Sequence, residues 1–477
     1  MQPSLLRNTL LYMPAQLLGP LVQFVVIVVW THLLDPAAFG VVTFVVAAQE
    51  MTALIGLYWW SLYMLRFQQR FANETERFRA MDNRMVLVGC LSQIVMAPLC
   101  FLAIGAAPTF AMSAAGAAYL ISRLLIAHYS EWARSKHRIG AYTFAQLAGP
   151  MLGSALSLVA IMAFGATPAV ALAAMAFGQA IGAAGLMSAL EVRPGRGVFD
   201  ATIFREATRY GAPLILSGLF GWMSINGVRL LVQANGGVVA VGLLSAGWGL
   251  GQRIANVMAM LCTAAAFPLA VDRIESGDRE GALRQVSLNG LLMLALLAPA
   301  VVGVTMLAHP LVYFIIAEKY RAVTEYTLPL AMAAGALRTF KTHVADQAAL
   351  LLERTRTITL ANFADALVTT LCAAIGLWRY GVVGAAAGAC LGAAIASIGQ
   401  LLYAALFLHL PLRPVDSLKI LAATAVMGLA LAFVPEPRDV FHLALTIALG
   451  AAVYVGAALV MFASARDVVL ARLFKRG

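Results

Sequence analysis

The sequence contains few charged residues: they make up 12% of its 477 residues, whereas hydrophobic residues make up 62%. A soluble domain carries roughly 25% charged residues, so this chain has about half the charge that a water-exposed surface needs. The mean hydropathy of +0.85 agrees with that shortage. These values exclude a large soluble enzyme, a secreted disulfide scaffold and a disordered chain, and they indicate a protein with many membrane-spanning segments.

Cysteine is also scarce, and its spacing fits neither a disulfide framework nor a zinc site. The five cysteines all fall inside apolar segments: Cys90, Cys100, Cys262, Cys372 and Cys390. We therefore expect no metal site and no cofactor. The Walker-type phosphate-binding motif is missing as well, and no loop is long enough for a nucleotide-binding domain. ATP is not expected to be the direct energy source.

A transmembrane helix needs roughly 20 mostly apolar residues. Fourteen such stretches follow one another along the chain, near residues 10–33, 38–65, 85–106, 108–130, 142–164, 167–190, 211–234, 238–269, 287–308, 325–352, 358–378, 381–409, 418–434 and 441–463. The expected fold class is an all-α polytopic membrane protein with 14 transmembrane helices.

The positions of Lys and Arg test this number, because the cytoplasmic loops of membrane proteins are enriched in these residues. With the N-terminus inside, 24 of the 33 fall in segments that the alternation places in the cytoplasm, and only Lys319, Arg321, Arg379 and Arg438 fall on the opposite side. A wrong number of spans would destroy this asymmetry. The sequence therefore predicts that both termini are cytoplasmic. The net charge of +11 then reflects topology, and no nucleic-acid partner is expected.

The two halves of the chain begin in a similar way. The starts of helices 1 and 7 carry the same three residue types: Arg7, Tyr12 and Pro14 in one, and Arg205, Tyr210 and Pro213 in the other. After each helix comes a tight outer turn, with Gly40 or Gly242 four or five residues into the next helix. Because both helices start inside, the repeat is parallel, with its axis along the membrane normal. We expect a six-helix N-terminal lobe at 1–192, a six-helix C-terminal lobe at 193–410, and two added helices with a cytoplasmic tail at 411–477.

Three short motifs are similar to those of a known transporter family. Leu33-Leu34-Asp35-Pro36-Ala37-Ala38-Phe39-Gly40 resembles the first outer turn of polysaccharide exporters and lipid-linked oligosaccharide flippases. These proteins belong to the multidrug/oligosaccharidyl-lipid/polysaccharide (MOP) superfamily. Ala266-Phe267-Pro268 with Gly277-Asp278, and His309-Pro310-Leu311-Val312 with Ala317-Glu318-Lys319-Tyr320, resemble two further passages of that family.

The resemblance implies a MATE-like fold and a flippase rather than an enzyme. Its substrate would be an undecaprenyl-pyrophosphate-linked oligosaccharide repeat unit. Alternating access would move it from the cytoplasmic to the periplasmic leaflet for exopolysaccharide, capsule or O-antigen synthesis. The implied location is the bacterial inner membrane, with a polysaccharide polymerase and glycosyltransferases as partners and H⁺ or Na⁺ as the coupling ion.

Three alternatives remain open. A peptidoglycan lipid-precursor flippase has the same number of helices and a cationic cavity, although helices 1 and 2 of this chain lack basic residues at mid-span. A cation-coupled multidrug exporter of the same superfamily would need an acidic cavity for cationic drugs. A membrane glycan polymerase or ligase belongs to a different class, and it usually builds its active site from a large outer loop, which this chain lacks.

Eight ionisable residues fall inside the predicted spans, where a charge is costly and usually faces a cavity or a partner. Five are basic and three are acidic: Arg123, Arg229, Arg253, Arg338 and Lys341 against Glu50, Asp346 and Asp365. Arg binds phosphate oxygens through two N–H groups, and Lys binds them as a point charge. The excess of basic residues therefore predicts a cationic cavity that suits a pyrophosphate.

We expect the five basic residues to line this cavity, and Arg253 matches the basic residue that the family commonly places on helix 8. Glu50 and Asp365 are candidates for proton or sodium coupling. Asp346 is expected to neutralise the two basic residues of helix 10. For each of these residues, a structural ion pair within the protein is the alternative.

Two further expectations concern aromatic and histidine residues. Aromatic belts at the membrane interface are expected at the inner end of helix 2 and at the outer end of helix 11: Tyr58, Trp59, Trp60 and Tyr63 in the first, and Trp378 and Tyr380 in the second. His128 is expected to be a hydrogen-bonded structural residue.

Overall fold

The structure of the protein is a computed structural model. It describes Gly19 and residues 21–463, without 68–69, 71–74, 137, 193–194, 196 and the side chains of 75 and 261–268. Arg7, Tyr12, Pro14 and both chain termini lie outside the described residues. The expected start of the first repeat and the expected cytoplasmic termini therefore have no structural counterpart.

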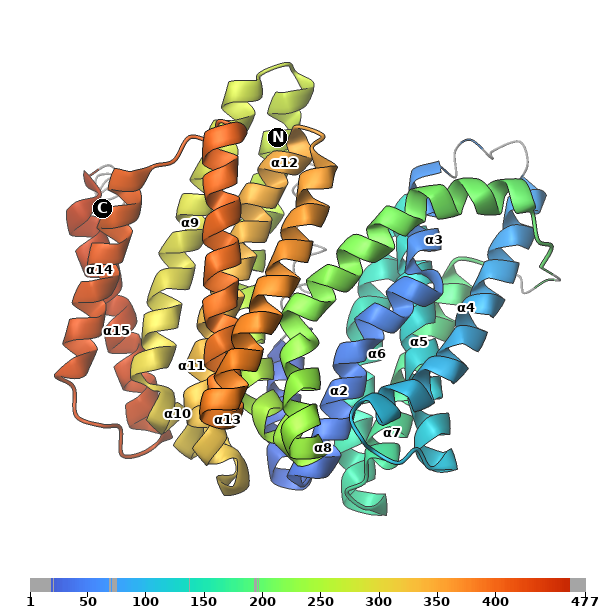
Figure 1. The fold of residues 1–477 in the computed structure, drawn as a ribbon, viewed down its shortest axis with the longest axis horizontal. Coiled ribbons are helices and arrows are strands. Elements are labelled where there is room, and N and C mark those ends of the chain that lie inside the picture. Colours follow the sequence, from blue (N-terminus) through green and yellow to red (C-terminus); the bar gives the residue numbers. More distant parts are fainter. Residues whose placement is uncertain are drawn as a thin grey trace, which may run out of the picture. The chain divides into compact units, whose positions relative to one another are not determined.

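The described chain is almost entirely helical, and no strand occurs in the described residues (Figure 1). An apolar helix at Leu21–Leu33 comes first. It is followed by α2 (Pro36–Ala53), η1 (Leu54–Tyr58), α3 (Trp59–Phe67), α4 (Thr75–Ala103), α5 (Phe110–Ser135), α6 (Ile139–Phe164), α7 (Pro168–Ala189), α8 (Ala201–Glu275), α9 (Arg279–Met306), α10 (Ala308–Ile315), α11 (Glu318–Lys341), η3 (Thr342–Asp346), α12 (Gln347–Leu351), α13 (Thr355–Phe407), α14 (Pro414–Ala432) and α15 (Val440–Met461).

The described elements supply the fourteen spans that the sequence predicts. Ten helices are long and apolar enough to cross a membrane. Two of them, α8 and α13, each join two helices at a kink, at Gly237 and Gly381. Leu21–Leu33 and the more polar α11 are the remaining two. Both kink glycines have a φ of 65°, a conformation that residues with a Cβ rarely adopt, so these two kinks need glycine.

The motifs behind the family resemblance are helix boundaries. The Asp35 carboxylate accepts a hydrogen bond from the N–H of Ala38 at 2.8 Å and caps α2, and Pro36 occupies the first turn, where no N–H is needed. Gly277, with a φ of 85°, follows the end of α8, and Asp278 caps α9. These residues set where helices stop and start.

The two outer turns that the sequence identifies as repeats pack directly against each other. A Cβ placed on Gly40 would meet the backbone of Val238 and Gly242, and a Cβ placed on Gly242 would meet the backbone of Pro36 and Gly40. Pro36 and Val238 each lie four residues before the respective glycine, so the contact is reciprocal. A two-fold axis produces contacts of this kind, which supports the parallel repeat.

The chain forms two compact units. Unit 1 consists of Met1–Ala246 and Ile358–Gly392, and unit 2 consists of Gly247–Thr357 and Ala393–Gly477. The boundaries between them fall inside α8 and near the start and in the middle of α13. These units describe packing, whereas the lobes at 1–192 and 193–410 describe a repeat in the sequence and stay a prediction.

Several helices begin earlier than the apolar stretches indicate. Helix α4 begins at Thr75 and α8 at Ala201, where the apolar stretches begin near residues 85 and 211. Hydropathy detects only the part of a helix that suits hydrocarbon, and polar turns can continue the helix beyond it. As a consequence, Asp82 lies inside α4, where its side chain is buried.

The inner end of helix 2 does not form the aromatic belt that we expected. Trp60 and Tyr63 are completely buried in a cluster that includes Phe78 and Met81. The Trp60 ring stacks on Tyr63 and Phe78, with ring centroids 5.6 and 5.8 Å apart. The expectation was wrong because the early turns of α4 extend along this end and cover it.

Within unit 1, α6 and α7 approach so closely that their backbones touch. A Cβ on Gly178 would collide with the backbone of Gly153, and a Cβ on Gly182 would lie 2.9 Å from the Cα of Gly149. Small residues four apart permit such an approach between membrane helices. The face of α7 that carries Gly178 and Gly182 is therefore a packing surface within the unit.

Replacing Gly178 with valine should force α6 and α7 apart. Overpacking of this kind costs about 1–3 kcal/mol, and we expect a lower temperature of thermal unfolding for the detergent-solubilised protein, followed by tryptophan fluorescence. A Cβ placed on Gly456 of α15 would have no neighbouring atom within 4 Å, so Gly456→Val is the matched control. Equal destabilisation by both substitutions would contradict the close contact.

In unit 2, the two added helices pack against α9 and each other (Figure 1). The Tyr454 hydroxyl of α15 donates to the carbonyl oxygen of Ala295 in α9 at 2.7 Å. A Cβ on Gly428 of α14 would lie 3.1 Å from the side chain of Val302. Helices α14 and α15 are therefore packed into unit 2 through their contacts with α9.

Candidate functional site

The second half of α8 and α11 lie side by side in unit 2, and glycines of α8 permit the close approach. The Gln252 side-chain amide donates to the carbonyl oxygen of Ala331 at 3.3 Å. One turn further on, the Thr339 hydroxyl donates to the amide oxygen of Asn256 at 3.4 Å. Arg253 is two residues from both Gly251 and Ala255, which face α11, so its side chain starts from the opposite side of α8.

Helix α11 carries two buried basic residues at its C-terminal end. Arg338 is 6% exposed and Lys341, one turn later, is 3% exposed. The π-helical turn Thr342–Asp346 follows directly, and such turns are frequent at functional sites. The Asp346 carboxylate is also buried, and it accepts a hydrogen bond from the Gln400 amide at 3.5 Å. Unit 2 therefore holds three of the five predicted basic residues on two packed helices.

Unit 1 holds the other two basic residues, each next to polar side chains. The Arg229 guanidinium is buried, donates to the Ser245 hydroxyl at 3.2 Å and also donates to the Asn226 side chain. Arg123 donates to the side-chain oxygen of Gln49 at 3.4 Å. Arg123 therefore lies beside Gln49, which precedes Glu50 in α2.

The two candidates for ion coupling lie on helix faces that point toward the first half of α8. Glu50 is three residues after Ala47, whose carbonyl oxygen accepts a hydrogen bond from Trp222 at 2.7 Å. Asp365 is three residues after Asn362, which donates to the Ser217 hydroxyl at 3.2 Å. Residues three apart share a helix face. Glu50 is exposed, whereas Asp365 is 1% exposed and accepts a hydrogen bond from Thr369 at 2.9 Å.

A buried polar network was not expected from the sequence. The Asp82 carboxylate accepts a hydrogen bond from the Trp60 indole N–H at 2.7 Å and lies 3.2 Å from Nε2 of His128. The other ring nitrogen of His128 lies 2.8 Å from the Ser61 hydroxyl. All four side chains are at most 4% exposed. The order Ser–His–Asp is that of a hydrolase triad, but a serine with no exposed surface meets no substrate.

Only one member of this network, His128, was predicted from the sequence. His128 is hydrogen-bonded, as expected, whereas Asp82 precedes the apolar stretch that begins near residue 85 and therefore falls outside the predicted spans. A polar signal was present, because Ser61 and His128 both interrupt apolar segments. Their pairing with Asp82 joins helices that are distant in the sequence, and one sequence alone does not show it.

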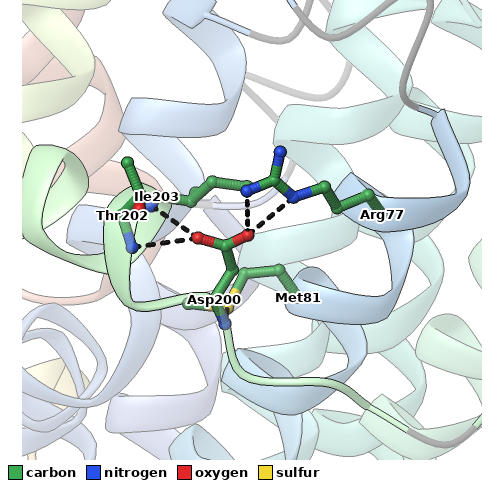
Figure 2. A network of polar contacts seen from close by, with 5 residues as sticks. All are labelled: Arg77, Met81, Asp200, Thr202 and Ile203. Carbon is green, nitrogen blue, oxygen red and sulfur yellow. Dashed lines mark hydrogen bonds and ion pairs between the residues drawn. The ribbon is translucent and has the colours of Figure 1, made fainter.

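Asp200 connects the start of α8 with α4, as Figure 2 shows. One carboxylate oxygen accepts hydrogen bonds from the N–H groups of Thr202 at 2.9 Å and Ile203 at 3.1 Å, which is helix capping. The other accepts one from Nε of Arg77 at 2.6 Å. The N–H of Asp200 itself points to the sulfur of Met81. The Ile203 N–H and then the Arg77 guanidinium lower the pKa of Asp200.

This lowered pKa predicts a dependence of stability on pH. Since the folded state favours the carboxylate, its stabilising effect is complete above the ordinary pKa of Asp and is lost as the pH falls below it. Asp200→Ala should cost about 1 kcal/mol at neutral pH, because it removes the helix cap. The difference in unfolding temperature between the unchanged protein and Asp200→Asn, which keeps a capping oxygen, should shrink toward about pH 3. A constant difference would contradict the role of the charge.

Comparisons with known proteins agree with this architecture. The profile of a family described as polysaccharide biosynthesis protein matches residues 5–272. The solved structure of lipid II flippase MurJ, in an inward closed conformation, has a TM-score of 0.76 and 13% identity, over 96% of this chain and 100% of that chain. An inward-facing multidrug resistance MATE family transporter of the MOP superfamily has a TM-score of 0.65 and 15% identity, over 84% and 98%.

A Vibrio cholerae MATE transporter has a TM-score of 0.55 and 16% identity, over 86% of this chain and 99% of that chain. A search of the curated proteins found no match to the sequence. At these identities the solved structures show a shared fold, and the family profile shows the relationship in sequence. The expected all-α, MATE-like membrane fold and the resemblance noted from the motifs are both confirmed.

The profile covers more than half of the chain, from ahead of the first outer turn to the end of helix 8. Within that range lies the capped turn at Asp35–Pro36, which carried the strongest part of the resemblance. The chain is a multi-pass membrane protein and belongs to the polysaccharide biosynthesis protein family.

Proposed function

We propose that the protein moves an oligosaccharide repeat unit, linked to undecaprenyl pyrophosphate, from the cytoplasmic to the periplasmic leaflet of the bacterial inner membrane by alternating access. Membership of a polysaccharide biosynthesis family supports the glycan, and the fold shared with a lipid flippase and with drug transporters supports transport. In this proposal the protein is a transporter and not an enzyme, and it supplies a polysaccharide polymerase with units that glycosyltransferases have built.

The observation that carries the proposal is the pair of buried cations on α11. Arg338 and Lys341 are almost completely withdrawn from solvent, one turn apart, at a π-helical turn. Arg253 lies on the neighbouring helix. Charges buried within membrane spans are costly and usually serve an ion or substrate pathway. A pyrophosphate offers the oxygens that guanidinium and ammonium groups bind best.

For the remaining candidates, we propose that Arg123 and Arg229 also bind the anionic substrate during transport and that Glu50 or Asp365 binds the coupling ion, H⁺ or Na⁺. A carboxylate in a membrane span can exchange an ion when the two access states differ in solvation. The position of both residues on faces toward the first half of α8 supports this role, because that segment also carries Arg229.

A peptidoglycan lipid-precursor flippase is the second candidate. The solved structure of lipid II flippase MurJ matches 96% of this chain with a TM-score of 0.76. The described parts of the first two spans, Leu21–Leu33 and Pro36–Phe67, argue for a different substrate. They contain one Lys or Arg, Arg66, and it lies at the predicted cytoplasmic end. A cation-coupled drug exporter is disfavoured by the excess of basic over acidic residues in the predicted spans, five against three.

The test is a deletion strain combined with reconstituted vesicles. In the strain, we expect the lipid-linked repeat unit to accumulate in the cytoplasmic leaflet and surface polysaccharide to be lost, with peptidoglycan synthesis unchanged. In vesicles, flipping of the purified lipid-linked glycan should require the protein and should respond to an imposed H⁺ or Na⁺ gradient. Accumulation of the peptidoglycan precursor instead would favour the second candidate, and normal levels of both lipids would refute both candidates. A flipping rate that no gradient changes would remove ion coupling.

A further inference from the structure

A basic pocket opens at the end of unit 1 that the topology predicts to be cytoplasmic. It has a volume of about 230 Å³ and is lined by Arg79, Lys136, Arg138, Leu190 and Glu191. Neither the cationic pathway on α8 and α11 nor the buried network around Asp82 includes any of these residues. The proposed transport pathway and the buried network therefore do not account for the basic residues of this pocket.

The fold builds the pocket from the ends of four helices. Arg79 comes from the second turn of α4, Lys136 directly follows α5, and Arg138 directly precedes α6. The Arg138 guanidinium donates to the carbonyl oxygen of Ala189, at the end of α7, at 3.4 Å. The ammonium group of Lys136 lies 4.6 Å from the centre of the Trp132 ring. All three basic residues are exposed, and Lys136 and Arg138 lie in the short connection between α5 and α6, where these two contacts hold them.

The charges of the pocket are out of balance. Three cations face one carboxylate, Glu191, and among the described residues none of the three forms an ion pair. Other basic residues of this end of unit 1 do form such pairs, as Arg134 does with Glu131 at 3.0 Å. Burial, followed by the charges of Arg79 and Arg138, lowers the pKa of Lys136, and Glu191 opposes the shift only in part. An anion placed between the cations would relieve this repulsion.

We propose that Arg79, Lys136 and Arg138 bind the phosphate group of a membrane lipid. Basic pockets between transmembrane helices on the cytoplasmic side bind anionic headgroups, because the surface of that leaflet is negatively charged. The guanidinium groups suit phosphate oxygens, and the pocket has room for such a group. Two lipids carry this chemistry, an anionic phospholipid of the leaflet and a polyprenyl pyrophosphate. The site does not depend on the proposed transport function.

Native mass spectrometry of the purified protein tests the proposal. Phosphatidylglycerol should remain bound to the unchanged protein where phosphatidylcholine does not. The triple variant Arg79→Gln, Lys136→Gln, Arg138→Gln should bind phosphatidylglycerol about ten- to a hundred-fold more weakly, since each basic residue near an anionic surface adds to the affinity. The matched control removes three exposed cations of unit 2, with Arg279→Gln, Arg354→Gln and Arg356→Gln.

The outcomes separate the two sources of phosphate. Retention that added inorganic pyrophosphate does not change assigns the pocket to the phospholipid, and displacement by inorganic pyrophosphate assigns it to a pyrophosphate-carrying lipid. Equal retention by the triple variant and the control overturns the proposal.

A second measurement needs no variant. An anion in the pocket would raise the pKa of Lys136 back toward its ordinary value, so the amine should be acylated more slowly at neutral pH when phosphatidylglycerol is added than when phosphatidylcholine is added. Peptide mapping after brief acylation reads this rate at Lys136, with Lys319 as the internal reference. Equal acylation of Lys136 with the two lipids would also overturn the proposal.

Discussion

Lys341→Gln is expected to reduce flipping of the lipid-linked glycan at least about tenfold, because a charge-assisted hydrogen bond to a phosphate oxygen contributes about 1.5–3 kcal/mol. The residue is 3% exposed, and glutamine fills a similar volume without a charge. We expect some loss of stability as well, since Lys341 interacts with neighbouring groups and removing one partner of a buried polar contact leaves the other unpaired. The measurements are the flipping rate in vesicles and the temperature of thermal unfolding of the same preparation.

The control for this prediction is a cation outside the spans. Lys319 is exposed on the predicted periplasmic side, and Lys319→Gln should leave the rate unchanged. Lys341→Arg should keep part of the rate, because it keeps the charge. If Lys341→Gln transports normally while remaining folded, the cationic pathway on α11 does not carry the pyrophosphate.

Asp82→Ala is expected to destabilise the protein strongly. The substitution removes the acceptor of the Trp60 indole N–H and the partner of the His128 ring, both of which are buried. A buried group left without its partner costs about 1–3 kcal/mol, so we expect a loss of about 2–6 kcal/mol. Thermal unfolding in detergent measures it. Glu280→Ala is the matched control, because this carboxylate is 83% exposed and its pair with Arg284 contributes little.

A double-mutant cycle distinguishes a network from two independent losses. Asp82→Ala and His128→Leu share one contact, so the combined variant should lose clearly less stability than the two single losses add up to. Strict additivity would show that the two side chains do not interact. A normal unfolding temperature for Asp82→Ala alone would show that the network does not contribute to stability.

The helices were predictable because the bilayer imposes both a length and a composition on each span. Lys and Arg then fixed their number independently. The ends of helices were less predictable, since α4 and α8 begin in polar sequence that hydropathy does not detect. Because the predicted span began near residue 85, Asp82 fell outside it, whereas the structure places Asp82 inside α4 with a buried side chain. The late start of the predicted span also made Trp60 look like an interface residue.

The sequence identified the charged residues of the candidate site, but it did not show which of them lie close together. Arg338 and Lys341 drew attention because a charge interrupted an apolar stretch, and Arg253 did so for the same reason. The sequence did not show that α8 and α11 pack through glycines, nor that a π-helical turn follows Lys341. Both depend on contacts between segments that are distant in the chain, for which one sequence holds no signal.

The reciprocal contact of Gly40 with Gly242 has a consequence for the order of biosynthesis. The two glycines are separated by about 200 residues, which a ribosome adds in roughly 10–40 s at 5–20 residues per second. During that interval the turn at Pro36 lies in the membrane without the surface that later covers it. Its early stability comes from the Asp35 cap and from the packing of α2 against α4, α5 and α7, which are made earlier than Gly242. Loss of the cap should therefore act mainly during synthesis, when fewer of the later contacts are present.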